Sequence, residues 1–501
     1  RSMAAGRWGR GRGAATCLLC VARVLGAAAL LWLGRGVPAV RADPYHFQGI
    51  PLGQRALGFG GAYTGLAEDP SAAYYNPAGL VWTGDSALSA SLTLNAFDRQ
   101  TIDQGYRTEM GSTDLRHSSQ PSLPSSVGFL KRLGKRRADG ERAHAIGIST
   151  FVIESRTLGF DVEIQDQPGA DIDTLSVDRS QRTAWQGVSY AYRASRRISF
   201  GFSGFLSLTR NSYREELIQA DLGAAAGNGS FDTEAASWSG HRAQVNVKNL
   251  VTRFGALWQA HDQLRLGLVI QPPCLHVRGQ ASVRERELDT DVAGGTGTFF
   301  NATQSGLPAH YPMPWEIRLG GSYKPLPWLT LNLDGSLYGP TGSPANPVIA
   351  IGERDPDPDT GAVPGVGRFE LDRWYRKTSG NVAVGSELLL WDLVALRVGF
   401  FTSLSAAPSV PKQSSSYYYP DIHRFGGAVS VGVTAAGYDL SLGATGLFGR
   451  GDAQAYDLRN DTMPYQRTDV HDATLFVFLT GMRNAINKLA KTAQEKLGIG
   501  K

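Results

Sequence analysis

Three acidic residues in a polar loop are spaced as the ligands of a calcium ion would be. In the stretch ERDPDPDTG, Asp355, Asp357 and Asp359 occupy alternate positions, as in a calcium-binding loop. Thr360 stands where such a loop needs its turn glycine, and no glutamate occupies the twelfth position. A solvated acidic loop over 355–361 is therefore the alternative to a calcium site.

Two further motifs fall short of a cofactor or metal site. In GFGGAYTG, Tyr63 stands where the last glycine of a GxGxxG phosphate loop is needed, and no crossover helix is expected after it. Cys274 and His276 would share one strand face, without other ligand residues nearby. The chain has no GxSxG or HExxH motif. We predict no cofactor, no metal and no enzymatic activity; a barrel hydrolase using scattered serine and histidine residues is the alternative.

The first 42 residues have the pattern of an export signal. They combine five early arginines with the apolar run VLGAAALLWL, and small residues precede Asp43. A transmembrane helix is the alternative, but ten apolar residues are fewer than the ~20 needed to span a bilayer. Removing this leader takes away seven basic and no acidic residues, so the net charge changes from +5 to −2. The basic balance therefore gives no argument for nucleic-acid binding.

The rest of the chain alternates in the manner of β-strands. Residues 86–97 read SALSASLTLNAF, in which apolar residues alternate with small polar ones. No run of 18 apolar residues follows residue 43, which excludes a helical membrane protein. The pattern predicts fourteen strands, at 86–97, 124–133, 143–157, 181–193, 197–211, 241–259, 263–285, 312–324, 328–340, 375–391, 393–403, 422–435, 437–449 and 471–480.

The links between these strands indicate the architecture. Long polar links follow the odd-numbered strands, and short links such as ASRR, AHDQ and KPLPW follow the even-numbered ones. An even number of antiparallel strands with tight turns at one end is typical of an outer-membrane β-barrel. A large two-sheet sandwich is the alternative. A barrel of fourteen strands is too wide for its own side chains to fill, so we expect a plug inside it.

The segment between the leader and the first strand carries a resemblance to a known family. It contains Gly53, Arg55, Ala56 and several glycines, then Ala67-Glu68-Asp69, then Asn76-Pro77-Ala78-Gly79. In this order it resembles the N-terminal hatch of the FadL/TodX outer-membrane transporters of long-chain fatty acids and aromatic hydrocarbons. The resemblance continues through strand-turn-strand units such as WEIRLGGSYKPLPWLTLNLDGSLY. It implies an outer-membrane location, a hatch over 43–85 and a barrel over 86–480, with hatch or gating residues Gly58, Gly60, Gly61, Asn76, Pro77, Ala78 and Gly79.

Glycine and proline also give a physical reason for this composition. Glycine adopts positive φ without steric cost, which suits a compact backbone inside a lumen. Pro77 fixes its own φ and favours an extended Asn76, whose side chain can hold neighbouring backbone groups. We therefore expect an ordered plug that shifts when a ligand arrives, with a static plug as the alternative.

Strand parity places a set of charges in the lumen. If the apolar faces meet lipid, the inward residues include Arg265, Glu316, Arg318, Asp334, Glu387, Arg397 and Asp439. Arg265, Arg318 and Arg397 are candidates for binding a fatty carboxylate, since a guanidinium suits that group. A mutual ladder of ion pairs is the alternative.

Three peripheral segments complete the prediction. The links 212–240 and 286–311 correspond to the loops that form the outer capture groove of the family. Within the first, a short amphipathic helix would place Leu217, Ile218 and Leu222 on one side, against ligand or a neighbouring loop. Residues 481–501 have apolar residues at helical spacing and predict a basic helical tail, which would lie in the periplasm on the inner leaflet or meet a protein partner.

The expected function is passive transport of hydrophobic molecules, most simply long-chain fatty acids, without a cofactor. An aromatic hydrocarbon importer is the closest alternative. A barrel acting as a secretion or assembly partner is the alternative from another class of protein. The expected surroundings are outer-membrane lipid, with no nucleic-acid partner.

Overall fold

The chain folds into one large antiparallel β-barrel. The computed structural model describes residues 45–47, 49–108, 111–119, 124–165, 172–222, 233–291, 296–342, 351–352, 369–370, 375–391, 393–415, 417–435, 438–460 and 462–484. The leader 1–42, the acidic loop 355–361 and the tail residues 485–501 lie outside these ranges. The described part of the chain contains no helix that is long and apolar enough to cross a membrane.

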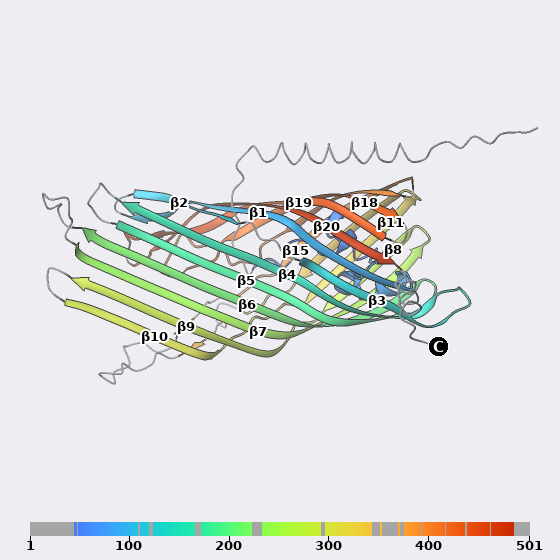
Figure 1. Ribbon diagram of the computed structural model, residues 1–501, viewed down its shortest axis with the longest axis horizontal. Coiled ribbons are helices and arrows are strands. Elements are labelled where there is room, and N and C mark those ends of the chain that lie inside the picture. Colours follow the sequence, from blue (N-terminus) through green and yellow to red (C-terminus); the bar gives the residue numbers. More distant parts are fainter. Residues whose placement is uncertain are drawn as a thin grey trace, which may run out of the picture.

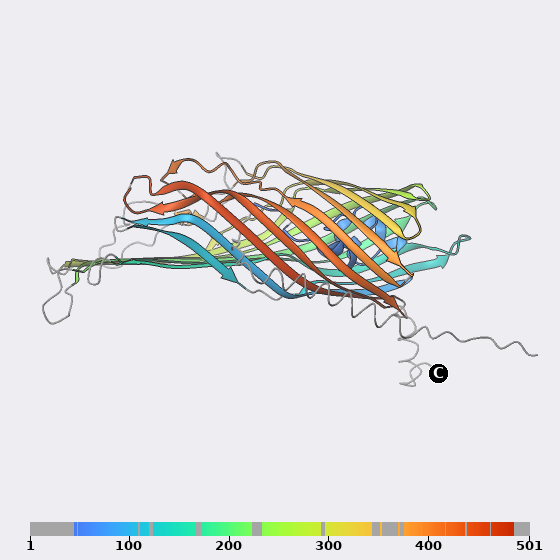
Figure 2. The same cartoon turned by 90° about the horizontal axis from the view of Figure 1, so that it is seen from above.

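The strands of the main sheet close on themselves. They are β1 (Ser86–Thr108), β2 (Gly111–Ser119), β3 (Pro124–Arg136), β4 (Arg142–Gln165), β5 (Ile172–Arg193), β6 (Ile198–Leu222), β7 (Thr233–His261), β8 (Leu264–Gln271), β9 (Leu275–Asp291), β10 (Thr296–Pro308), β11 (Glu316–Leu326), β12 (Leu329–Tyr338), β15 (Ser379–Leu390), β16 (Val394–Ser403), β17 (Gln413–Ser414), β18 (Asp421–Ala435), β19 (Tyr438–Asp457) and β20 (Tyr465–Asn484). The first long strand, β1, pairs antiparallel with both β3 and the last strand, β20. This double pairing closes the barrel, whose strands run obliquely along its length (Figures 1 and 2).

Each of the fourteen predicted ranges overlaps a strand, but the divisions differ. The range 263–285, expected as one strand, forms β8 and β9, because Pro272 and Pro273 lack the N–H groups that a ladder needs. Strands β2 and β10 lie where long links were expected, and β13 (Ile351–Gly352) pairs with β14 (Phe369–Glu370) in a separate small sheet. The last strand reaches Asn484, so residues 481–484 belong to the barrel wall and not to a tail.

The longest strands extend far beyond one membrane thickness. Strand β7 has 29 residues and β6 has 25, whereas a membrane-spanning strand needs about 9–11. The helix predicted for YREELIQADLGAAAG, residues 213–227, is therefore wrong over 213–222: these residues continue β6 and pair with both neighbouring strands, and 223–227 lie outside the described residues. A β-strand presents alternate residues to opposite faces, so Leu217 packs with the interior cluster of the barrel while Ile218 is 42% exposed. Leu222 ends the same strand.

The polarity of the wall reverses along these long strands. Near the C-terminal end of β5, the outward side chains Val188 and Tyr190 are apolar and exposed. Near its N-terminal end, the inward side chains Leu175 and Val177 are apolar and buried. These inward residues pack with Ile102, Ile422 and Val470 of strands that are not their neighbours in the sheet. Near the tight turns, the lower end of the barrel, apolar side chains face outward, as in a membrane barrel. Toward the opposite, upper end they face inward, as in the core of a soluble protein.

The described residues between 45 and 85 lie inside the barrel, with their helices near the end that has the tight turns (Figures 1 and 2). Tyr45 and His46 lie further along the barrel, where they contact Val247 and Ile422. It contains α2 (Gln54–Gly58), α3 (Ala72–Tyr75) and the 3₁₀ helix η1 (Pro77–Trp82). Four of its aromatic residues form one cluster with inward side chains of β4–β7; they are Phe59, Tyr63, Tyr74 and Tyr75. We refer to residues 45–85 as the N-terminal segment.

Candidate functional site

The turn at Asn76 ties the N-terminal segment to itself and to the wall. Asn76 is fully buried and extended, as its position before Pro77 predicts. Its side-chain oxygen accepts a hydrogen bond from the N–H of Ala78 (3.1 Å) and so caps η1. Its side-chain nitrogen donates to the carbonyl oxygens of Thr64 (3.1 Å) and Ala256 of β7 (3.0 Å). One amide thus joins two parts of the segment and one strand.

Glycines of the wall allow the segment to lie directly on the strands. A Cβ atom added to Gly201, Gly255 or Gly267 would come closer than 3.0 Å to backbone or side-chain atoms of Thr64, Asn76 or Pro77. Added to Gly385 or Gly399, it would meet the backbone of Phe59 and Gly60 equally closely. Real Cβ atoms do not approach so near, so these positions exclude any larger residue. We call Gly201, Gly255, Gly267, Gly385 and Gly399 the glycine seat.

The segment's own predicted glycines have specific conformations. Gly60 and Gly61 have φ of 64° and 87°, in the left-handed region, as expected for a tight turn. Gly58 ends α2, where a Cβ would meet the side chains of Ser430 and Arg397. Gly79 lies in η1 against the backbone of Ala67.

Charged contacts hold one side of the segment to the wall. Arg55 Nη2 lies 2.8 Å from Glu387 Oε1 of β15, and Arg397 Nε of β16 lies 2.6 Å from Glu387 Oε2. Glu68 Oε1 lies 2.5 Å from Arg265 Nη1 of β8, and its other oxygen lies 3.2 Å from Arg55 Nη1. These contacts form a continuous chain of alternating charges between the segment and three strands.

Asp334 of β12 provides a further anchor. Its Oδ2 atom accepts hydrogen bonds from the backbone N–H groups of Tyr63 (2.9 Å) and Thr64 (2.8 Å). Hydrogen bonds to a charged acceptor are stronger than neutral ones. The carboxylate therefore fixes the part of the segment that also lies on the glycine seat.

The predicted lumenal charges are confirmed as inward-facing, but the three candidate arginines are held by acidic residues. Glu316, Arg318, Asp334, Glu387, Arg397 and Asp439 are buried inside the barrel. Arg318 Nη2 lies 2.7 Å from Glu316 Oε1, and Arg265 and Arg397 bind Glu68 and Glu387 as described above. The geometry favours the ion-pair interpretation of these arginines over a carboxylate-binding role.

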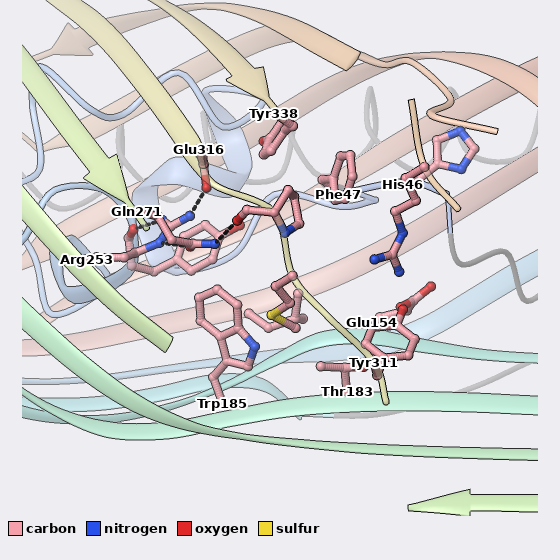
Figure 3. A pocket seen from close by; sticks show the side chains of 15 residues that line it. His46, Phe47, Glu154, Thr183, Trp185, Arg253, Gln271, Tyr311, Glu316 and Tyr338 are labelled. Carbon is pink, nitrogen blue, oxygen red and sulfur yellow. Dashed lines mark hydrogen bonds and ion pairs between the residues drawn. The ribbon is translucent and has the colours of Figure 1, made fainter. Parts of the chain in front are cut away.

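An aromatic pocket lies next to the N-terminal segment. It is lined by Phe47, Tyr74, Trp185, Tyr311 and Tyr338 together with Met313 and Ile153. Figure 3 shows the labelled rings around one space, with Phe47 from the segment, Trp185 from β5, Tyr338 from β12 and Tyr311 from the link before β11. Arg253 closes one end: it donates to Gln271 Oε1 (2.9 Å) and pairs with Glu316. Arg376 lies at the other end, 4.9 Å above the ring of Tyr311 and 5.4 Å from that of Phe47.

The pocket is small in this arrangement. Its volume is about 50 Å³, whereas a cavity of about 150 Å³ is known to hold one benzene molecule. A molecule of the size of benzene could therefore enter only if some of the lining residues moved. Sequence patterns did not reveal this pocket, because its residues come from the segment, six strands and the links before β11 and β15.

No known protein-family model matches the chain, and no curated protein matches it in sequence. Several solved structures share its fold. A FadL homologue of Pseudomonas aeruginosa is 15% identical, with 88% of this chain and 99% of that chain covered and a TM-score of 0.58. The Pseudomonas putida toluene transporter TodX is 14% identical (87% and 99% covered, TM-score 0.54), and the Ralstonia pickettii toluene transporter TbuX is 14% identical (87% and 98% covered, TM-score 0.51).

The geometry first defines a class: a closed antiparallel barrel whose interior is occupied by its own N-terminal segment. Within that class the chain has the FadL/TodX fold, because the superposition extends over most of its length. The resemblance carried by residues 53–79 is thus confirmed at the level of the fold.

The Glu68 contacts predict how the segment responds to pH. Burial alone would raise the pKa of Glu68, but Arg265, Lys324 and Arg55 outweigh it and lower the pKa from 4.5 to about 2. A depressed pKa means that the stabilisation is complete above pH ~4.5 and is lost as the pH falls through ~2, with a size on the order of 3 kcal/mol. We expect the conductance of the protein in planar bilayers to stay constant from pH 8 to pH 5 and to rise only below pH ~3.

In the Glu68→Gln variant the higher conductance should already be present at pH 7. A wild-type conductance that rises between pH 8 and pH 5 would show that another group controls the segment.

Proposed function

We propose that the protein is a passive outer-membrane channel for hydrophobic molecules, with a wall of fourteen strands and residues 43–85 as its hatch. The observation that carries the proposal is the aromatic pocket bounded by the N-terminal segment, which itself rests on the glycine seat. A ligand that enlarges the pocket by moving Tyr74 displaces part of the segment, because Tyr74 belongs to both. Ligand entry and opening of the lumen are then one event.

Long-chain fatty acids are the first substrate class that we propose. The five rings offer an apolar surface for an acyl chain, and Arg376 places a guanidinium at one end of them, where its Nη1 donates to the carbonyl oxygen of Pro312 (2.7 Å). Guanidinium groups bind carboxylates in bidentate fashion. Arg376 takes the role in this proposal that sequence parity suggested for Arg265, Arg318 and Arg397.

An aromatic hydrocarbon is the second candidate substrate. It is favoured by the predominance of rings in the pocket and by the toluene transporters among the structures with the same fold. Such a ligand needs no cationic partner, so Arg376 would matter little for its uptake.

Uptake in whole cells tests the proposal. Cells that lack their own transporter would be given labelled oleate or labelled toluene, with and without this protein. Uptake of either compound supports a hydrophobic channel and fixes the substrate class. Uptake of neither, with the barrel shown to be folded, would contradict transport and favour a secretion or assembly role.

Replacing Arg376 distinguishes the two substrates. We expect Arg376→Gln to reduce oleate uptake by roughly tenfold, since a charged hydrogen bond is worth about 1.5–3 kcal/mol, and to leave toluene uptake within twofold. The neighbouring Lys377, whose side chain is 45% exposed, provides the matched control Lys377→Gln. Equal losses for both compounds would mean that Arg376 only supports the pocket.

A further inference from the structure

The outer surface of β5, β6, β7 and β9 changes abruptly from apolar to basic. On β6 the outward residues Phe200, Phe202 and Leu206 are exposed and apolar, and Arg210 follows them on the same face. On β7, Phe254 and Leu250 are followed in the same way by Lys248. Continuing along these four strands, the exposed outward cations are Arg182, Arg210, Arg242, Lys248, Arg278, Arg284 and Arg286, which we call the basic band.

The strand register brings members of the band directly opposite one another. Arg182 is paired with Arg210, Lys248 with Arg278, and Arg242 with Arg284. Directly opposed residues on one sheet face have Cβ atoms only about 5 Å apart, and like charges at that spacing destabilise a sheet. Three such pairs therefore concentrate positive charge on one patch.

Carboxylates of the described residues do not neutralise the band. None of its seven cations forms an ion pair within the described ranges; Arg210 instead donates to Asn246 (3.0 Å) and Arg284 to Thr303 (3.1 Å). Arg214, on the same face, is held by Glu216 at 2.8 Å and is not part of the band. Across the barrel the outward Arg450 of β19 has its own partner, Asp469, at 3.2 Å.

The band lies at the height of lipid headgroups. Ten residues separate Ile198 from Leu208 on β6, and at ~3.3 Å per residue and a tilt of ~40° this apolar stretch is about 25 Å tall. That is the height of the apolar zone of an outer-membrane barrel. Arg210, Lys248 and Arg278 therefore come at its edge, at the end of the barrel opposite the tight turns.

We propose that the basic band binds the phosphate groups of the lipid that surrounds the upper rim of the barrel, a phosphorylated saccharolipid of lipid A type. Its acyl chains would lie on the apolar residues below, and its phosphates would meet paired guanidinium groups, which bind phosphate in bidentate fashion. The inference rests on the proposed outer-membrane location and orientation. It adds a lipid-binding site on the outside of the wall, separate from the transport pocket inside.

Binding of purified lipid A to the full-length protein in detergent tests this site. Bisphosphorylated lipid A and its dephosphorylated form would be titrated separately and measured by native mass spectrometry. We expect the variant Arg210→Gln/Arg242→Gln/Lys248→Gln/Arg278→Gln to bind the bisphosphorylated lipid on the order of a hundredfold more weakly. The control Arg450→Gln should change binding by less than about twofold, because Arg450 already has a partner.

The folded state of each variant would be confirmed by its heat-modifiable migration on gels. If the quadruple variant does not assemble, single Arg242→Gln and Arg278→Gln variants should each still weaken binding several-fold. Equal binding of the two lipid forms, or of variant and wild type, would overturn the proposal. Full displacement by millimolar inorganic phosphate would also overturn it, since the site would then be one for a free anion.

Oleate and toluene uptake by the quadruple variant separates this inference from the transport function. Unchanged uptake with lost lipid A binding is the expected result. Loss of lipid binding and uptake together would show that the band is needed for transport itself, and would contradict a separate lipid site.

Discussion

Replacement of Gly399 by valine is expected to displace the N-terminal segment and to raise the ion conductance of the barrel by roughly tenfold or more. The Cβ of any side chain at this position would lie closer than 3.0 Å to the backbone of Phe59 and Gly60. Backbone cannot swing aside as a flexible side chain does, so the segment has to move as a whole. Overpacking of this kind costs about 1–3 kcal/mol, which shifts the ratio of seated to displaced segment accordingly.

Planar-bilayer recordings on the refolded protein would measure this effect. Gly335→Val is the matched control, because a Cβ added to Gly335 of β12 meets no atom within 4 Å and the residue is exposed. The control should conduct like the wild type. A Gly399→Val barrel that is folded and still closed would show that the segment tolerates a shift of its seat, and would remove the glycine seat from the proposed gating.

The strands of the barrel wall could be predicted from the sequence, because the alternation that identifies them involves residues close together in the chain. Alternation with period two places apolar residues on one face of each strand. In a membrane every backbone N–H and C=O group of a strand must pair with a neighbouring strand, so successive strands form one closed sheet. The strand starts at Ser86 and Pro124 agree with the expected ones, and the division of 263–285 follows from Pro272 and Pro273. These features depend on residues that are adjacent in the chain.

The upper ends of the strands could not be read in the same way. There the apolar side chains point inward, and the outward ones are charged, as for Leu217 beside Glu216. Such a stretch has the composition of a polar loop, and YREELIQADL also has helical spacing of its apolar residues. Only pairing with β5 and β7, over residues that are distant in the chain, determines that it is a strand.

In the site, too, features set by neighbouring residues could be predicted, and contacts between distant residues could not. The turn at Asn76 and Pro77 and the positive φ of Gly60 follow from residue types alone. Parity placed Asp334 and Glu387 in the lumen, but not their contacts with Thr64 and Arg55. Those contacts, like the pocket around Tyr74, depend on how the segment is threaded through the barrel.

Removal of Glu316 is expected to be the most destabilising single change in the lumen. Arg253 and Arg318 both pair with this carboxylate, and the side chains of the three residues are at most 3% exposed. Taking one partner from a buried ion pair leaves an uncompensated charge and costs about 3–5 kcal/mol. Glu316→Gln keeps the shape of the side chain but leaves two guanidinium groups facing a neutral amide.

The temperature at which heat-modifiable migration is lost would report this change. An exposed pair, Arg450 and Asp469, supplies the control Asp469→Asn, which should cost less than about 1 kcal/mol because solvent already screens the pair. Arg253 also donates to the carbonyl oxygen of Tyr74 and lies 4.4 Å above its ring. Glu316→Gln should therefore loosen the pocket as well as the fold, and the double variant with Arg253→Gln should be less unstable than the sum of the two single ones, since one buried charge is removed. Strict additivity would show that Arg253 and Glu316 act independently, against the geometry of the buried triad.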